Sequence, residues 1–87
     1  MMYAFTRLDD GTEVVYSDAY EVQGSKTVKV YFEKPIYGDL RSAECYLPKY
    51  EWMNIHGFSE EEISHLQEYI KSVSHTIIRL AAQETQE

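Results

Sequence analysis

The chain has a single cysteine, Cys45, among its 87 residues. One cysteine excludes a disulfide within the chain, and one cysteine with three scattered histidines lacks the ligand spacing of a structural zinc site. No apolar run approaches the about 20 residues that a membrane-spanning helix needs. The N-terminal residues lack the basic leader and apolar stretch of a signal peptide, so we expect a soluble, cytoplasmic protein with no membrane partner.

Basic residues are also scarce. Eight Lys and Arg stand against fifteen Asp and Glu, which gives a formal net charge of −7. Because neutralisation of phosphates drives most nucleic-acid binding, an acidic chain without a basic stripe is not expected to bind nucleic acid. Solubility alone explains the excess of acids. A basic protein partner is the alternative explanation.

The chain shows no pattern that is typical of a catalytic, cofactor-binding or metal site. Its four glycines are isolated and form no phosphate-binding loop. His65 and His75 are ten residues apart, which on one helix separates them by about 15 Å and prevents joint coordination of one ion. Cys45 alternates in register with Ala43 and Leu47, so it is predicted to lie in the core rather than to react. We therefore expect no cofactor and no enzymatic activity.

What is present is a complete helix start at residues 58–63. Ser59 and Glu62 form a capping box, and Phe58 and Ile63 occupy the positions of a hydrophobic staple. Three glutamates lie where the helix dipole favours negative charge. An amphipathic stripe follows at 3-4-3-4-3 spacing, made of Ile63, Leu66, Ile70, Val73, Ile77 and Leu80. These features predict one long helix over residues 59–83.

The residues before this helix alternate as strands do. The pattern predicts strands over 2–8, 13–22, 27–33 and 40–47, with Pro35 breaking the third strand and Pro48 ending the fourth. In the second strand, Val14, Tyr16, Tyr20 and Val22 share a face, and Asp18 on that same face indicates a bulge or bend near Ser17–Asp18.

The resulting fold class is α+β in a single domain, 1–87. Residues 1–47 form a four-stranded antiparallel meander, and residues 59–83 form a helix packed on one face. Residues 48–58 are an aromatic connector expected to pack at the sheet edge, with a short helical turn as one possibility.

The predicted helix is longer than the predicted sheet. A helix of about 23 residues is about 35 Å long, whereas strands of about six or seven residues let it cross only about 25 Å of sheet. Ile77 and Leu80 would then lie on an overhang, and burying each would contribute about 1.5–3 kcal/mol. This mismatch predicts a homodimer through the C-terminal half of the helix. The alternative is a helix that ends near Val73, since β-branched residues follow it.

Eight tyrosines are the remaining unusual feature. Tyr31 and Tyr46 lie on the strand faces opposite the apolar face, where they either stabilise the sheet as a cross-strand pair or recognise a partner. With Ile77 and Leu80 they form the candidate interaction surface. The leading hypothesis is a non-enzymatic protein-interaction or regulatory module. The alternative is a small-molecule pocket on the open sheet face, lined by Tyr20, Tyr31, Tyr46 or Trp52. An enzyme using His56, Cys45 or Asp18 is the third hypothesis.

Overall fold

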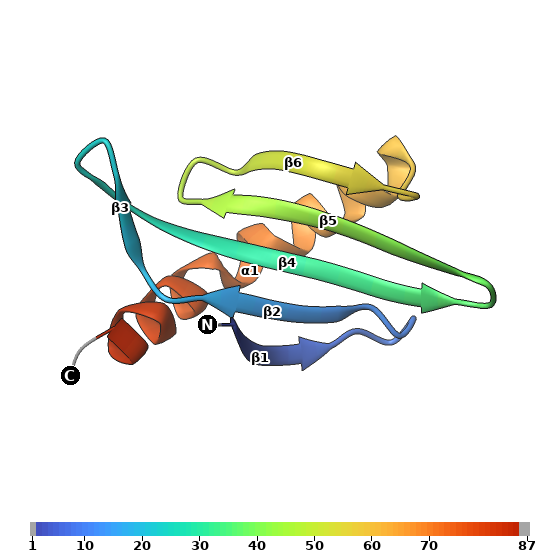
Figure 1. Ribbon diagram of the computed structural model, residues 1–87, viewed down its shortest axis with the longest axis horizontal. Helices are drawn as coiled ribbons and strands as arrows, with labels where there is room; N and C mark the ends of the chain where they lie inside the picture. The colour runs from blue at the N-terminus through green and yellow to red at the C-terminus, as the bar shows by residue number, and fades with distance from the viewer. Residues whose placement is uncertain (1, 86–87) are drawn as a thin grey trace.

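The computed structural model describes residues 2–85, which form an antiparallel sheet of six strands followed by one helix (Figure 1). The elements are β1 (Met2–Arg7), β2 (Glu13–Ser17), β3 (Tyr20–Val22), β4 (Ser25–Ile36), β5 (Asp39–Leu47), β6 (Glu51–His56) and α1 (Glu60–Thr85). The strand order is β1-β2-β4-β5-β6, and β3 pairs with the beginning of β4. The predicted α+β class, with a C-terminal helix, is confirmed, but the sheet has six strands rather than four.

The first additional strand comes from the connector. Residues 48–58 contain β6 rather than a helical turn, and β6 pairs with β5. Alternation does not reveal this strand because Met53 and Ile55 are both exposed. Trp52 alone carries β6 onto the core: its ring stacks on Phe32 at 5.5 Å, and its Nε1 donates a 2.6 Å hydrogen bond to Gln67 of α1.

The second additional strand arises because the predicted bend at Ser17–Asp18 divides the second strand into β2 and β3. Tyr16 pairs with Val30, but Tyr20 pairs with Thr27, so one extra residue is inserted opposite β4. The Ser17 hydroxyl accepts a 3.0 Å hydrogen bond from the Lys29 amide within this bulge. A shift of one residue moves every later side chain to the other face of the sheet. Tyr20 therefore lies on the opposite face from Tyr16. The prediction from the sequence pattern, that the two residues share a face, is wrong.

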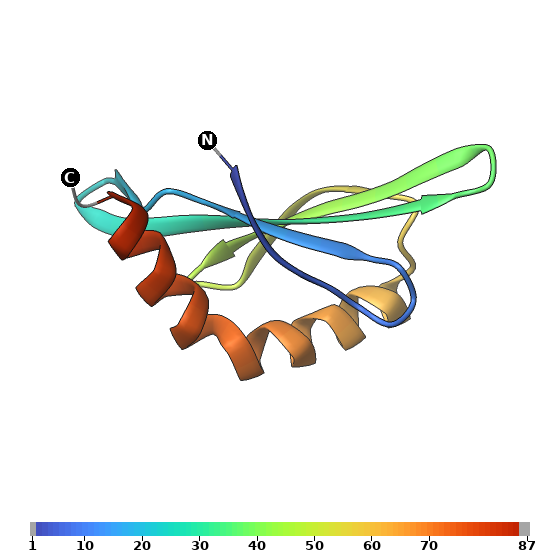
Figure 2. The ribbon, with the colours of Figure 1, turned by 90° about the horizontal axis from the view of Figure 1, so that it is seen from below.

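Pro35 also behaves differently from the prediction, because it lies inside β4 and pairs with Leu40 of β5. The pairing of β4 with β2 ends at Glu33. Beyond that point β4 has no described neighbour on its other side, so the N–H that proline lacks is not needed there. The β4–β5 hairpin therefore extends well past the rest of the sheet (Figure 2).

The helix begins as the sequence predicts. Ser59 Oγ accepts the Glu62 amide at 3.1 Å, and Glu62 carboxylate oxygen accepts the Ser59 amide at 2.8 Å, which completes the capping box. Just before it, Gly57 adopts a φ of 84°, and a Cβ atom there would come within 2.9 Å of the Arg41 side chain. Arg41 in turn forms a 2.9 Å ion pair with Glu62. Glycine thus lets the chain turn closely past β5 into α1.

The core lies between α1 and one face of the sheet (Figure 2). It is built from alternate residues of the three central strands and from the apolar stripe of the helix. Its buried residues are Val14, Tyr16, Val28, Val30, Phe32, Ala43, Cys45, Leu47, Leu66, Ile70, Ile77 and Ala81. The predicted core position of Cys45 is confirmed, since its side chain is fully buried.

The helix does not overhang the sheet. β4 has 12 residues and β5 has 9, so both exceed the six or seven residues assumed from the sequence. The domain measures 40 Å along its longest axis, and the 26 residues of α1 correspond to about 39 Å. Ile77 is fully buried and Leu80 is half-buried against the core. The C-terminal half of α1 therefore has no overhanging apolar residues at positions 77 and 80 that would require a dimer.

Candidate functional site

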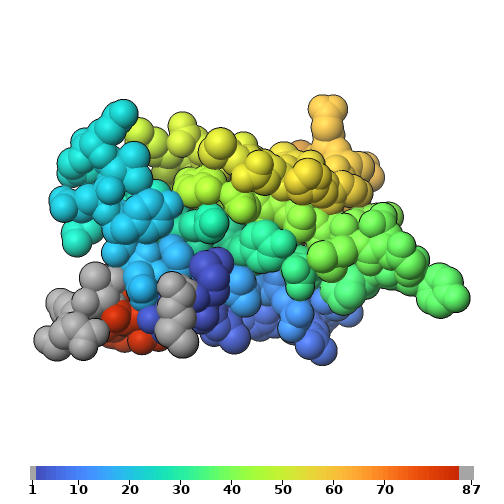
Figure 3. All heavy atoms as spheres, in the orientation of Figure 1, coloured from blue at the N-terminus to red at the C-terminus, as the bar shows by residue number. Residues whose placement is uncertain are grey.

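The sheet face opposite α1, which we call the open face, is covered by no described segment (Figure 3). Strand pairing sets side chains on this face in two adjacent rows. One row reads Ala4, Val15, Tyr31, Glu44 and Met53, and the next reads Met2, Ser17, Lys29, Tyr46 and Glu51. Apolar, phenolic and charged side chains therefore mix on a surface that packing within the described chain does not use.

Glu44 is the centre of a polar network on the open face. One of its carboxylate oxygens accepts hydrogen bonds from the Tyr46 hydroxyl and the Asn54 amide, both at 2.9 Å. The other oxygen lies 3.6 Å from the Lys29 ammonium. The Glu44 side chain is only 15 % exposed. Burial alone would raise its pKa, but the two hydrogen bonds and the charge of Lys29 outweigh burial and lower it. Glu44 is therefore a fixed negative charge near neutral pH.

The two tyrosines of the predicted interaction surface do lie on the open face, both half-buried. They are diagonal neighbours, because Tyr31 pairs with Glu44 and Tyr46 pairs with Lys29. Each hydroxyl donates to a glutamate two residues away on its own strand, at 3.4 Å from Tyr31 to Glu33 and 2.9 Å from Tyr46 to Glu44. These bonds orient the rings along their strands.

A groove of about 380 Å³ opens beside Tyr46. The bulge after β2 turns Tyr20 and Val22 to this side, where they line one groove with residues from the end of β5 and the start of β6. Figure 1 shows β3 beside the turn that joins β5 to β6. The lining residues are Tyr20, Val22, Gln23, Ser25, Thr27, Tyr46, Pro48, Lys49, Glu51 and Met53. Tyr20, Val22 and Met53 are among the more exposed large apolar residues of the domain. We call this feature the aromatic groove.

The chemistry of the aromatic groove suits binding rather than proton transfer. Burial, with the hydrogen bond to Glu44, raises the pKa of Tyr46 to about 12. Burial, with the charge of Glu44, raises the pKa of Tyr20 as well. Both phenols therefore stay neutral near pH 7 and present flat, amphipathic surfaces. Cys45 lies on the opposite face, and burial raises the pKa of its thiol to about 12, so it is not a nucleophile there.

The other half of the predicted interaction surface lies elsewhere. Ile77 is inside the core, and Leu80 packs against the core from the helix. Neither residue comes near Tyr31 or Tyr46 across the sheet, because α1 covers the opposite face (Figure 2). Trp52 also faces the helix side, so it does not line the aromatic groove. The small-molecule hypothesis names Trp52 as one of the residues that would line such a pocket.

Sequence reasoning does not single out Glu44, Asn54 or Lys29. Alternation places Glu44 on the open face. Its contact with Asn54 could not be predicted, because Asn54 belongs to β6, a strand that the sequence pattern does not indicate. Asn54 sits at a bulge in β6 with a φ of 52°, a backbone conformation that asparagine tolerates better than most residues. The predicted bend at Ser17–Asp18 could have indicated that Tyr20 lies on the open face, since one inserted residue moves the later side chains to the other face of the sheet.

Residues 2–85 contain no group of three or more His, Cys, Asp or Glu side chains arranged to hold a metal ion. Within the same residues, α1 is not apolar enough to cross a membrane. Comparison of the chain with protein-family models, with curated proteins and with solved structures finds no match.

Proposed function

We propose that this domain is a non-enzymatic interaction module that binds a protein partner through the open face. The observation that carries the proposal is the Glu44 network, an ordered charged cluster beside two neutral tyrosines and an exposed apolar groove. Tyrosines that are already fixed lose little entropy on binding, and such residues are frequent at the energetic centres of interfaces. A regulatory role follows if the partner's own site is covered in the complex.

The charges of the open face favour a basic partner. Strand register sets Glu13 directly opposite Glu33, and like charges in that arrangement destabilise a sheet. Arg7 pairs with Glu13 at 3.0 Å, while Lys29 is engaged with Glu44. A lysine or arginine from a partner would relieve the remaining repulsion at Glu33. Complementary charge of this kind increases association rate and specificity more than affinity.

The predicted homodimer remains a proposal with a different surface. Because Ile77 is buried, two copies would have to meet through the open face or through the edge strands β1 and β6. Absolute mass by light scattering across a dilution series measures this directly. A dimer that dissociates when Tyr31 is changed to Lys would place self-association on the open face, and a monomer at every concentration would remove it.

The test of the main proposal uses photo-crosslinking followed by binding with purified components. A photoreactive phenylalanine analogue at position 31 captures the partner, and the same analogue at position 72, on the outer side of α1, is the control. The identified partner is then purified and titrated with the domain. We expect Tyr31→Ala and Glu33→Lys each to weaken binding by about tenfold. Glu68→Lys, on the helix, should change it by less than about twofold. Equal loss for all three variants would contradict the proposal.

A second function is favoured by the aromatic groove. Its volume of about 380 Å³ lies at the lower end of the range of small-molecule sites, and two tyrosines line it. A small planar ligand could bind between Tyr20 and Tyr46. Ligand-observed NMR with a fragment mixture tests this function, with Tyr20→Ala expected to remove the saturable signals. Fragments that bind the variant as well as they bind the original domain would eliminate it.

A further inference from the structure

A second cavity, of about 290 Å³, lies at a distance from the open face, between the β1–β2 turn and the first turns of α1. Its lining residues are Leu8, Asp9, Asp10, Thr12, Phe58, Glu62, His65, Leu66 and Tyr69. Leu66 is buried, Leu8, Phe58 and Tyr69 are half-buried, and Asp9 and Asp10 are exposed. The cavity thus has an apolar interior and carboxylates at its mouth. We call it the turn cavity.

Thr12 is the unusual residue of the turn cavity. It is completely buried, and its hydroxyl has no partner at hydrogen-bonding geometry within residues 2–85. Its backbone is satisfied, because the amide donates to Asp10 at 3.0 Å and the carbonyl accepts from Leu8 at 2.8 Å. A buried hydroxyl without a partner is costly, and such groups in folded proteins usually have a reason in ligand binding or bound water.

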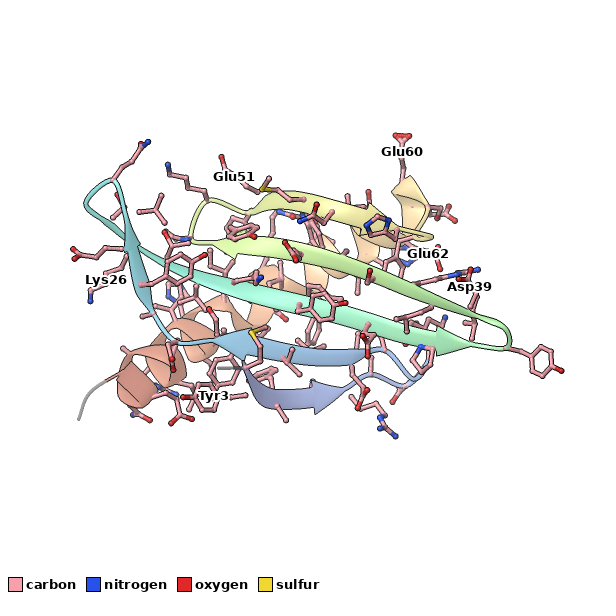
Figure 4. The ribbon with its side chains drawn as sticks, in the orientation of Figure 1. Tyr3, Lys26, Asp39, Glu51, Glu60 and Glu62 are labelled. Carbon is pink, nitrogen blue, oxygen red and sulfur yellow. The ribbon has the colours of Figure 1, made fainter. Side chains whose placement is uncertain are left out.

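The charge around the turn cavity is negative. Lys34 balances Asp10 at 3.3 Å, and Arg41 balances Glu62 at 2.9 Å. Asp9 has no ion pair within residues 2–85, so one carboxylate is left over. The hydrogen bond from the Thr12 amide, together with the charge of Lys34, lowers the pKa of Asp10, which is therefore ionised near neutral pH. Glu60 and Glu61 add negative charge nearby, and Glu60 points away from the domain (Figure 4). These charges disfavour an anion although a helix begins here.

We propose that the turn cavity binds a small primary alkylammonium ion. Its ammonium group would satisfy the charge of Asp9 and donate a hydrogen bond to the Thr12 hydroxyl oxygen. Its short alkyl chain would lie against Leu8, Phe58 and Leu66, where burial is favourable. One excess carboxylate, one unsatisfied buried acceptor and an apolar wall fit this ligand class together. A carboxylate or a phosphate would satisfy none of the charge.

The test is an NMR titration of the isotope-labelled domain with n-pentylammonium, pentan-1-ol and pentanoate. We expect saturable amide shifts in residues 8–12 and 58–69 with n-pentylammonium, at millimolar affinity for so small a ligand. Pentanol should bind about tenfold more weakly, and pentanoate should produce no saturable shift. Equal binding of the alcohol and the ammonium would overturn the proposal, and so would the absence of saturable shifts.

Variants separate the proposed contacts from a general effect of charge. Thr12→Val and Asp9→Asn should each weaken n-pentylammonium binding by about tenfold. Thr12→Ser should restore most of the affinity, because it returns the hydroxyl. Glu21→Gln makes the same charge change as Asp9→Asn on β3, outside the turn cavity, and should leave binding unchanged. If Thr12→Val binds as tightly as the original domain while its spectrum remains folded, the Thr12 contact is absent and the proposal fails.

The same titration distinguishes a free amine from a lysine side chain of another protein. A blocked lysine, with acetyl and methylamide ends, carries the same ammonium and alkyl chain but adds a peptide on one side. We expect it to bind more weakly than n-pentylammonium, because its two amide groups would have to lie beside the apolar side chains that line the turn cavity. Tighter binding of the blocked lysine would overturn the assignment to a free amine. Failure here would leave the open-face proposal unaffected, since the two surfaces share no lining residue.

Discussion

Neighbouring residues in β5 have opposite environments and therefore opposite chemistry. Glu44 faces the open side and keeps its charge because Asn54, Tyr46 and Lys29 compensate for its partial burial. Cys45 faces α1 and lies among apolar side chains, which disfavour a thiolate. Alternation along a single strand thus separates a polar face from a core.

The first residue-scale prediction concerns the reactivity of Cys45. Burial raises the pKa of its thiol to about 12 and blocks access, so a disulfide reagent should label the folded domain very slowly at pH 8. The labelling rate should increase by about a thousandfold or more once denaturant unfolds the chain, because exchange then no longer requires opening. Rapid labelling of the folded domain would contradict the buried position.

Thr12 gives a second residue-scale prediction. Thr12→Val replaces an unpartnered buried hydroxyl with a methyl group of similar size, so we expect the free energy of unfolding to rise by about 1 kcal/mol. Urea denaturation followed by circular dichroism measures the change. Thr12→Ala is the control and should lower stability, because it leaves a void. A residue that destabilises the domain while aiding ligand binding is expected at a functional site. Destabilisation by Thr12→Val would indicate that the hydroxyl has a structural partner.

At the scale of elements, local signals in the sequence specify the helix start, and geometry confirms it. Ser59 and Glu62 exchange both hydrogen bonds of the capping box, and Phe58 and Ile63 are half-buried at the staple positions. Strand boundaries are less local. β4 can continue through Pro35 because no described strand pairs with it on the side away from β5 at that point. β6 forms a strand because it pairs with β5. Neither condition can be recognised in a short stretch of sequence.

The element-scale prediction is that Ser59→Ala destabilises the domain by about 0.5–2 kcal/mol, through loss of the cap on the Glu62 amide. Thermal unfolding provides the measurement. Ser64→Ala, one turn later at an exposed position, is the matched control. It should be neutral or slightly stabilising, since alanine has the higher helix propensity. If the two variants have the same melting temperature, the cap contributes nothing to stability.

At the scale of the whole molecule, paired carboxylates and shielded phenols determine the pH range of stability. The pKa values of Asp10, Glu44 and Glu62 are lowered in the folded domain by hydrogen bonds and neighbouring cations that outweigh partial burial. The pKa values of Tyr3 and Tyr46 are raised to about 12, by a hydrogen bond to Asp18 and by burial respectively. Figure 4 shows Tyr3 beside the C-terminal half of α1.

These pKa changes predict a loss of stability at both ends of the pH scale. A lowered carboxyl pKa stabilises the fold above the unfolded value of about 4, and this contribution disappears as pH falls through the folded value. A raised tyrosine pKa stabilises the fold below about pH 10, and this contribution is lost as pH rises toward 12. Urea midpoints measured across pH should therefore form a plateau between about pH 5 and 10.

Variants identify the groups behind each limb of that profile. Tyr46→Phe should reduce the alkaline loss, and Glu44→Gln should reduce the acid loss, because each removes a titrating group. A midpoint that continues to rise above pH 10 would contradict the assignment to tyrosines. An acid limb unchanged in Glu44→Gln would assign that limb to Asp10 and Glu62 instead.

The sequence by itself determined what depends on neighbours along the chain. These features are the α+β class, the helix and its cap, the bend at Ser17–Asp18, and the placement of Cys45 inside with Tyr31 and Tyr46 on the other face. Period-two and period-3.6 patterns and capping geometry act within a few residues, so they can be read directly.

Only the tertiary structure decided what depends on register between distant segments. The one-residue bulge carries Tyr20 across the sheet to form the aromatic groove, and β6 brings Asn54 to Glu44. The packing of α1 along the sheet leaves Ile77 fully buried, which removes the overhang that suggested a dimer. The turn cavity likewise joins Thr12 to a helix that begins almost fifty residues later. Pairing energies between such segments exist only when the chain is folded, so no local pattern records them.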